Sequence, residues 1–161
     1  MATFKALFPS ALLSVVIIIV ASTAWAQSPS YGPDVTLANA KKLAAAALAE
    51  AQKNNWNVAI AIVDNHGALV YYERMDDTQS ASPVIAIEKA RSAAMFRRTT
   101  RAMEDTVNKG RTSFLGIPLA TPITGGLPIV VAGKIAGGIG VSGVSSDQDE
   151  QVAKAGLEGL K

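Results

Sequence analysis

The stretch LPIVVAGKIAGGIGVSG, residues 127–143, decides the fold class, because it supports two incompatible interpretations. Its two apolar runs flank Ala132-Gly133-Lys134, and a short glycine turn between apolar runs predicts a β-hairpin of an antiparallel sheet. Its Gly138, Gly140 and Gly143 also match G-x-G-x-x-G, the spacing of a dinucleotide-binding turn in a parallel sheet. The residues around the glycines distinguish the two interpretations.

A dinucleotide-binding turn requires a helix that begins directly on the glycines, because the helix N-terminus holds the pyrophosphate. Here Ile139 and Val141 continue a strand pattern between the glycines. The next helix is predicted to begin only near Ser146, with Asp149 as its capping-box partner. We therefore expect a glycine-rich strand, which another backbone or a flat ligand approaches closely.

The rest of the chain also predicts paired strands between helices. NVAIAIVD (57–64) and ALVYYERMD (68–76) surround the turn Asn65-His66-Gly67, and their apolar, β-branched residues predict a first hairpin. Further helices are predicted at 37–55 after the N-cap Thr36, from Ser82-Pro83 onward, and at 100–109 before Gly110. This order predicts an α+β fold, with a central antiparallel sheet built from two hairpins and flanking helices.

The N-terminus has the three parts of a secretory signal peptide. Lys5 precedes a short apolar run at 11–21, which is followed by Ala24-Trp25-Ala26, an A-x-A cleavage pattern. A membrane anchor is the alternative, but a spanning helix needs about 20 apolar residues. We predict a signal peptide at 1–26, a flexible segment at 27–35 and one domain at 36–161. The mature protein would then be periplasmic or secreted, with no membrane span.

Composition excludes several classes of function. The chain has no cysteine and one histidine, which excludes disulfides, thiol chemistry and a His/Cys metal cluster. Its 15 basic and 13 acidic residues nearly balance, which argues against a nucleic-acid partner. The low charge, together with many alanines and 13 glycines, indicates a homo-oligomer.

Five motifs in order resemble the GlcG/HbpS-like family, which is also similar to the C-terminal domain of PduO-type proteins. The motifs are V-D-x-x-G-x-L (63–69), R-M-D (74–76), K-A-x-x-A (89–93), G-G-x-P-I (125–129) and G-x-I-G-V-S-G (137–143) followed by Q-D-E (148–150). The resemblance extends from about Thr36 to Gly156. It implies a profilin-like fold, higher oligomers and haem binding, with corrinoid binding in some relatives.

His66 is the candidate ligand of haem iron, because neutral imidazole is a common axial ligand. Many relatives carry G-G-H-L in this turn, which would place their histidine at the position of Ala68. His66 lies two positions earlier in this chain. The alternative interpretation of His66 is a polar turn residue without a ligand.

Three cationic side chains, Arg74, Lys89 and Arg91, are candidates to hold a carboxylate, either of a haem propionate or of a small organic acid. The alternative for all three is an ion pair with Asp76 or Glu88.

Gly125, Gly126 and Pro128 are a further candidate cofactor-binding loop. Paired glycines before a strand leave backbone N–H groups that a ligand can approach.

These features lead to three hypotheses. The first is an exported haem- or tetrapyrrole-binding protein of the scavenging or sensing type, with a corrinoid-binding module as its variant. The second is an enzyme or accessory subunit that acts on a small organic acid in the same pocket. The third is an assembly protein whose glycine-rich strands pack subunits together.

Overall fold

The computed structural model describes residues 28–161, so the predicted signal peptide at 1–26 lies outside the described residues. The elements are α1 (Leu37–Lys53), β1 (Ala59–Val63), β2 (Leu69–Arg74), α2 (Ser82–Phe96), α3 (Thr100–Asn108), the 3₁₀ helix η1 (Thr112–Gly116), β3 (Gly126–Val131), β4 (Lys134–Ser142) and α4 (Ser146–Glu158). The strands form one sheet in the order β2-β1-β4-β3, and every neighbouring pair is antiparallel. The predicted α+β fold with two hairpins is confirmed.

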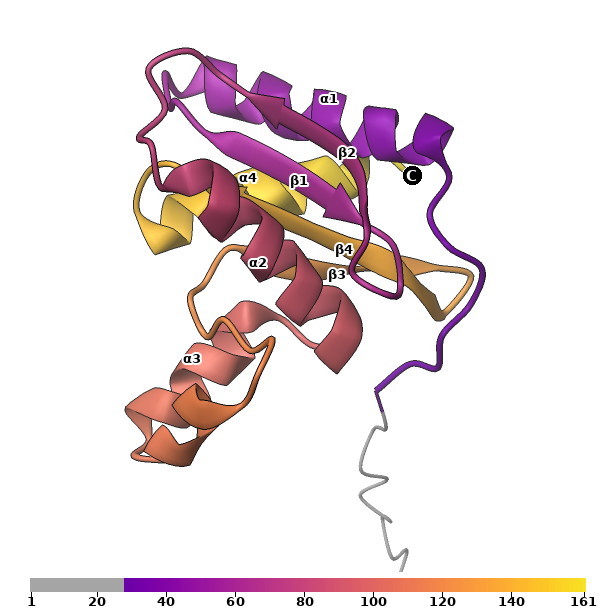
Figure 1. The fold of residues 1–161 in the computed structure, drawn as a ribbon. Coiled ribbons are helices and arrows are strands. Elements are labelled where there is room, and N and C mark those ends of the chain that lie inside the picture. The colour runs from indigo at the N-terminus through magenta and orange to yellow at the C-terminus, as the bar shows by residue number, and fades with distance from the viewer. Residues whose placement is uncertain (1–27) are drawn as a thin grey trace, which may run out of the picture.

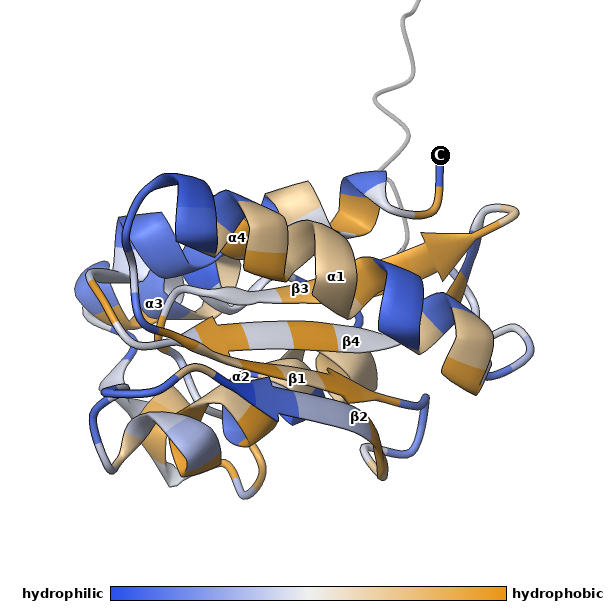
Figure 2. Ribbon diagram, turned by 90° about the horizontal axis from the view of Figure 1, so that it is seen from above, coloured by the Kyte–Doolittle hydropathy of each residue, from blue (hydrophilic) through white to orange (hydrophobic). Residues whose placement is uncertain are grey.

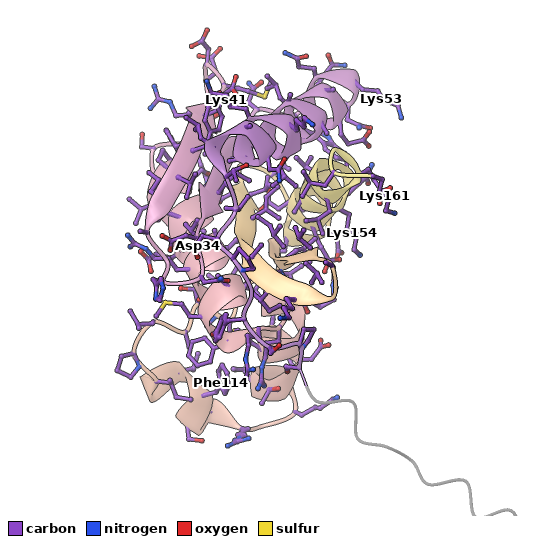
Figure 3. The ribbon with its side chains drawn as sticks, turned by 90° about the vertical axis from the view of Figure 1, so that its right-hand side faces the viewer. Asp34, Lys41, Lys53, Phe114, Lys154 and Lys161 are labelled. Carbon is purple, nitrogen blue, oxygen red and sulfur yellow. The ribbon has the colours of Figure 1, made fainter. Side chains whose placement is uncertain are left out.

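The sheet lies between two helical layers (Figures 1 and 2). Helices α1 and α4 lie side by side on one face, as Figure 3 also shows, and α2 covers the other face. The core beneath α1 and α4 is built from large aliphatic side chains, among them Leu43, Ile60, Ile62, Ile139 and Val141. Within residues 28–161, no helix has the length and hydropathy of a membrane span.

The core beneath α2 is built from the smallest residues instead. Ala59 and Ala61 of β1 face Ala86, Ala90 and Ala94 of α2. The strand beside them carries glycines at the same level, so the helix backbone rests almost directly on the sheet.

Two of the three glycines in the G-x-G-x-x-G spacing, Gly138 and Gly140, serve this close contact. A Cβ atom at Gly138 would overlap the carbonyl oxygen of Ala90, and one at Gly140 would overlap that of Ala86. The sequence predicted that either another backbone or a flat ligand approaches the glycine-rich strand. In the structure, the backbone of α2 does so.

The start of α4 differs from the prediction by one residue. Ser145 is the N-cap, and it forms a capping box with Gln148, whose side chain accepts a hydrogen bond from the Ser145 N–H. The predicted pair of Ser146 and Asp149 is therefore wrong. Both serines have the right residue type, but only the Ser145 register leaves Asp149 free to point into the core, where it is buried.

The described part of the segment predicted to be flexible at 27–35 is hydrogen-bonded to the sheet. We call residues 28–35 the N-terminal strap. The Ile135 N–H donates to Ser30 O (2.9 Å), the Gly32 N–H donates to Ile135 O (2.8 Å), and the Val35 N–H donates to Ala136 O (2.7 Å). These bonds fix the strap along the start of β4, and Val35 is buried in the core.

Candidate functional site

A hollow of about 420 Å³ lies beside the turn between β1 and β2. We call it the His66 hollow. Its wall combines three parts of the chain: the strap, the β1–β2 turn and the last turn of α2. The lining residues are Tyr31, Gly32, Pro33, Asp34, Asn65, His66 and Met95.

His66 is exposed on the turn, and hydrogen bonds to the Asp64 side chain fix the backbone of that turn. The Asp64 carboxylate accepts hydrogen bonds from the N–H groups of His66 (2.8 Å) and Ala68 (2.9 Å). Gly67 follows with a φ of +80°, in the left-handed region that glycine adopts without strain. The imidazole is exposed on a turn of fixed shape, which suits a group that must meet a ligand.

Asn65, next to His66, joins the turn to the strap. Its side-chain amide donates to Gly32 O (2.8 Å), and its backbone N–H donates to the Asp34 carboxylate (3.1 Å). The residue is buried, yet its Oδ1 has no hydrogen-bond partner within residues 28–161. A buried acceptor without a partner is costly, so this oxygen is a group that a bound ligand or water can satisfy.

The last turn of α2 closes the hollow from the third side. Met95 lines it, and the Met95 sulfur would lie 3.0 Å from a Cβ atom at Gly67, so helix and turn are in contact. Arg91 secures that contact, because its Nε donates to Gly67 O (2.9 Å) while Nη1 lies 2.6 Å from Glu88.

Lys89 lies in the interior instead, away from the hollow. Its Nζ is 2.8 Å from Asp149 Oδ2 and 3.0 Å from Val141 O, and only 1% of the Lys89 side chain is exposed. Burial raises the pKa of the Asp149 carboxyl, and the ion pair with Lys89 opposes that rise. The ammonium is therefore engaged in a contact that ties α2 to α4.

The predicted glycine loop surrounds this ion pair. Gly125 has a φ of +126°, and a Cβ atom there would lie 2.8 Å from Lys89 Nζ. The Gly126 N–H donates to Thr100 Oγ1 (2.8 Å), and both glycines are buried. The structure brings Lys89, Gly125 and Gly126 together, and the side chain of Lys89 fills the space beside the two glycines.

Arg74 and Pro128 lie elsewhere. Arg74 is exposed at the end of β2, in a second hollow of about 400 Å³ that also includes Glu73, Asp76 and Asp77. These carboxylates weaken the attraction of that hollow for an anion. Pro128 is half-buried on β3, an edge strand of the sheet, where the missing N–H of proline is tolerated. The predicted residues therefore do not converge on one site in a single chain.

The tyrosines of β2 lie on opposite faces of the sheet. Tyr71 packs on the side of α1 and α4, and Tyr72 packs against the alanines beneath α2. The Tyr71 hydroxyl donates to Glu73 (3.1 Å), and this bond raises the pKa of Tyr71, which disfavours a phenolate ligand.

Of the seven residues that line the His66 hollow, only His66 belongs to the predicted site set; the other six are Tyr31, Gly32, Pro33, Asp34, Asn65 and Met95. Tyr31 was hidden in a segment without periodicity, and the only signal for it was an aromatic residue beside Gly32-Pro33. Within the described part of the chain, no three His, Asp or Glu side chains gather as a metal site.

Glu150 is the centre of an ion cluster between α3 and α4. Burial by itself raises the pKa of Glu150, but Arg101 and Lys154 more than offset this and hold the pKa below its ordinary value. A carboxyl whose pKa is lowered by folding stabilises the fold above its unfolded pKa of about 4.3, and that contribution disappears as the pH falls through the lower, folded pKa.

We therefore expect Glu150→Gln to lower the free energy of unfolding by about 1–2 kcal/mol at pH 7. The difference from the unsubstituted protein should shrink below pH 4 and vanish once Glu150 is protonated in both states. Urea unfolding at pH 7, 5 and 3 measures this. Glu158→Gln, which removes an exposed pair with Lys161, is the matched control and should change stability by less than about 0.5 kcal/mol. A pH-independent loss in Glu150→Gln would contradict the assignment.

Comparison with known proteins identifies the family. The sequence model described as "Haem degrading protein HbpS-like" matches residues 35–158. The chain belongs to the HbpS-like family. It is 51% identical to the protein GlcG of Escherichia coli K12 over 103 residues, which is 64% of this chain and 77% of GlcG. It is also 30% identical over 123 residues to the corrinoid adenosyltransferase PduO of Salmonella typhimurium, covering 74% of this chain but 37% of PduO.

Two solved structures share the fold. The crystal structure of HbpS superposes with a TM-score of 0.76 at 32% identity, covering 82% of this chain and 94% of HbpS. A crystal structure of a complex of PduOC with haem superposes with a TM-score of 0.72 at 27% identity, covering 78% of this chain and 94% of PduOC.

Proposed function

We propose that this member of the HbpS-like family is an exported haem-binding protein of the scavenging or sensing type, and that haem binds in the His66 hollow. The observation that carries the proposal is the set of side chains around that hollow. Histidine, tyrosine and methionine each serve as axial ligands of haem iron in proteins, and His66, Tyr31 and Met95 all line it. The family description and the haem complex of PduOC support the choice of ligand.

The residues present fit a haem group in one further respect. Arg97 lies over the Tyr31 ring at 5.3 Å and is half-buried, so a guanidinium is close to the hollow for a propionate carboxylate. Bound haem would supply an iron centre, and His66 is the side chain on a fixed, exposed turn that would hold it.

Replacing His66 by alanine should change how hemin binds. We expect the purified protein to shift the Soret band of hemin at micromolar concentration, and His66→Ala to move that band and weaken binding about tenfold or more, because the nitrogen ligand is lost. A titration followed by visible absorption measures both effects.

The matched control is Gln79→Ala, an exposed position in the loop between β2 and α2, which should bind hemin as the unsubstituted protein does. Absence of any Soret shift with the unsubstituted protein would overturn the haem proposal. A normal shift that His66→Ala leaves unchanged would overturn the assignment of the iron ligand.

A corrinoid is a second candidate ligand, which the similarity to PduO supports. It presents a flat macrocycle of comparable shape to the same hollow. Titration with cobalamin beside hemin separates the two: saturable binding of cobalamin without binding of hemin would favour the corrinoid.

We propose export from the signal-peptide pattern of residues 1–26, with the mature protein in the periplasm or outside the cell. We also propose a homo-oligomer, because large apolar side chains are exposed around η1: Leu115, Ile117, Leu119 and Ile123. Cell fractionation tests the first proposal and sedimentation velocity tests the second.

A further inference from the structure

We propose that the N-terminal strap is part of the ligand site and that Tyr31 is its specificity-determining residue, an aromatic wall that selects a flat macrocycle. This inference rests on the proposed haem site and names a part of it that the family match does not contain. The match begins at residue 35, whereas four of the seven residues that line the hollow lie at 31–34.

The Tyr31 ring is fixed before any ligand arrives. Its hydroxyl donates to Met95 O at 2.7 Å, which ties the strap to the end of α2. Arg97 lies 5.3 Å from the ring centroid as a cation–π partner, and the Arg97 Nη1 also donates to Pro29 O at 3.3 Å. A side chain that is already ordered loses little further freedom on binding, so its contact contributes more to affinity.

Arg97 holds this position in an unusual backbone conformation. It ends α2 with a φ of +53°, in the left-handed region where glycine is the ordinary residue. This conformation is less favourable for an arginine than for a glycine, and the Arg97 guanidinium lies over Tyr31.

The strap also positions the turn that carries His66. Asn65 binds Gly32 O through its side chain and Asp34 through its backbone N–H, so the residue beside the candidate iron ligand is anchored to the strap. The same short segment therefore fixes the position of the Tyr31 ring relative to His66, the candidate iron ligand.

Tyr31 nevertheless remains 45% exposed within a hollow, which is a large apolar area for a tethered aromatic ring. Aromatic rings pack on one another with an energy beyond area burial, and a porphyrin offers such a face. The expected contribution of the ring is about three- to tenfold in affinity.

Two probes distinguish the contribution of the Tyr31 ring to binding from that of the iron ligand His66. Metal-free protoporphyrin IX presents the macrocycle without iron, and its fluorescence reports binding; hemin reports ligation through the Soret band. We expect Tyr31→Ala to weaken metal-free protoporphyrin about three- to tenfold, whereas Tyr31→Phe, which keeps the ring, should stay within about twofold of the unsubstituted protein. His66→Ala should bind metal-free protoporphyrin normally.

Arg97→Gly is the second variant, because glycine suits the backbone at this position and the fold is retained. It removes both the partner of the Tyr31 ring and the cation nearest the porphyrin propionates, and should weaken metal-free protoporphyrin about two- to fivefold. Leu37→Ala, an exposed apolar position just beyond the strap, is the matched control and should have no effect.

The outcomes are distinguishable. If the unsubstituted protein shifts the Soret band of hemin and Tyr31→Ala binds both macrocycles normally while remaining folded by circular dichroism, the role of Tyr31 is overturned and the haem proposal stands. If the unsubstituted protein binds neither macrocycle, the haem proposal fails and the inference fails with it. Equal loss in Tyr31→Phe and Tyr31→Ala would overturn the aromatic wall in favour of the hydroxyl bond to Met95.

Discussion

Lys89→Met is expected to lower the free energy of unfolding by about 3–5 kcal/mol, well above the effect of a typical single substitution. The methionine has similar volume, so packing is retained, but the Asp149 carboxylate loses the ammonium 2.8 Å away. The Asp149 side chain is only 3% exposed, and a buried charge without a partner is far more costly than the pair itself. Urea unfolding followed by far-ultraviolet circular dichroism measures the change.

The double variant Lys89→Met, Asp149→Leu tests the cause. Because it removes both charges, it should recover most of the stability that the single substitution loses. Lys154→Met is the matched control, since it breaks a pair whose lysine is 63% exposed, and should cost less than about 1 kcal/mol. A loss below about 1 kcal/mol in Lys89→Met would show that the pair is not a structural tie between α2 and α4.

Gly140→Val is expected to lower the free energy of unfolding by about 3 kcal/mol or more. The first carbon of the new side chain would overlap the Ala86 carbonyl oxygen, and the nearest atoms are helix backbone, which cannot turn aside as a side chain can. The substitution therefore has to lift α2 from the sheet. Thermal unfolding and the near-ultraviolet spectrum, which reports tertiary packing, measure the result.

Gly116→Ala is the matched control for this substitution. A Cβ atom at Gly116 meets nothing within 4 Å, so its effect should stay within about 0.5 kcal/mol. The assembly hypothesis expects Gly140→Val to break an oligomer of folded subunits, whereas the structure places Gly140 inside one chain. Folded monomers of normal stability would support the assembly hypothesis and contradict a role for Gly140 in seating α2 on the sheet.

The elements of this fold were predictable because each depends on neighbours in the sequence. Both hairpins follow from apolar runs around a short glycine turn, and Ala132 and Gly133 do adopt positive φ values, as a tight hairpin turn requires. Thr36 caps α1 as predicted, accepting a hydrogen bond from the Asn39 N–H. Local pattern was sufficient for these features, and the family motifs identified the rest of the architecture.

The site was less predictable because its contacts join distant parts of the chain. Lys89 and Asp149 are 60 residues apart, and nothing in either neighbourhood indicates that one will bind the other. Tyr31 meets Met95 across 64 residues, from a segment that has no pattern of its own. The sequence could therefore point to His66 by residue type, but the walls around it required the folded chain.

The glycine and alanine layer beneath α2 also affects how the loss of side-chain conformational entropy on folding is distributed over the core. Alanine and glycine have no rotamers to lose, so the alanines and glycines of this layer become fixed without loss of side-chain conformational entropy. The leucines, isoleucines and valines on the opposite face of the sheet bear that loss and supply most of the apolar burial that offsets it. The two faces of the sheet thus contribute to folding in different ways. The face beneath α2 depends mainly on the close fit of backbones, and the face beneath α1 and α4 depends mainly on the hydrophobic effect.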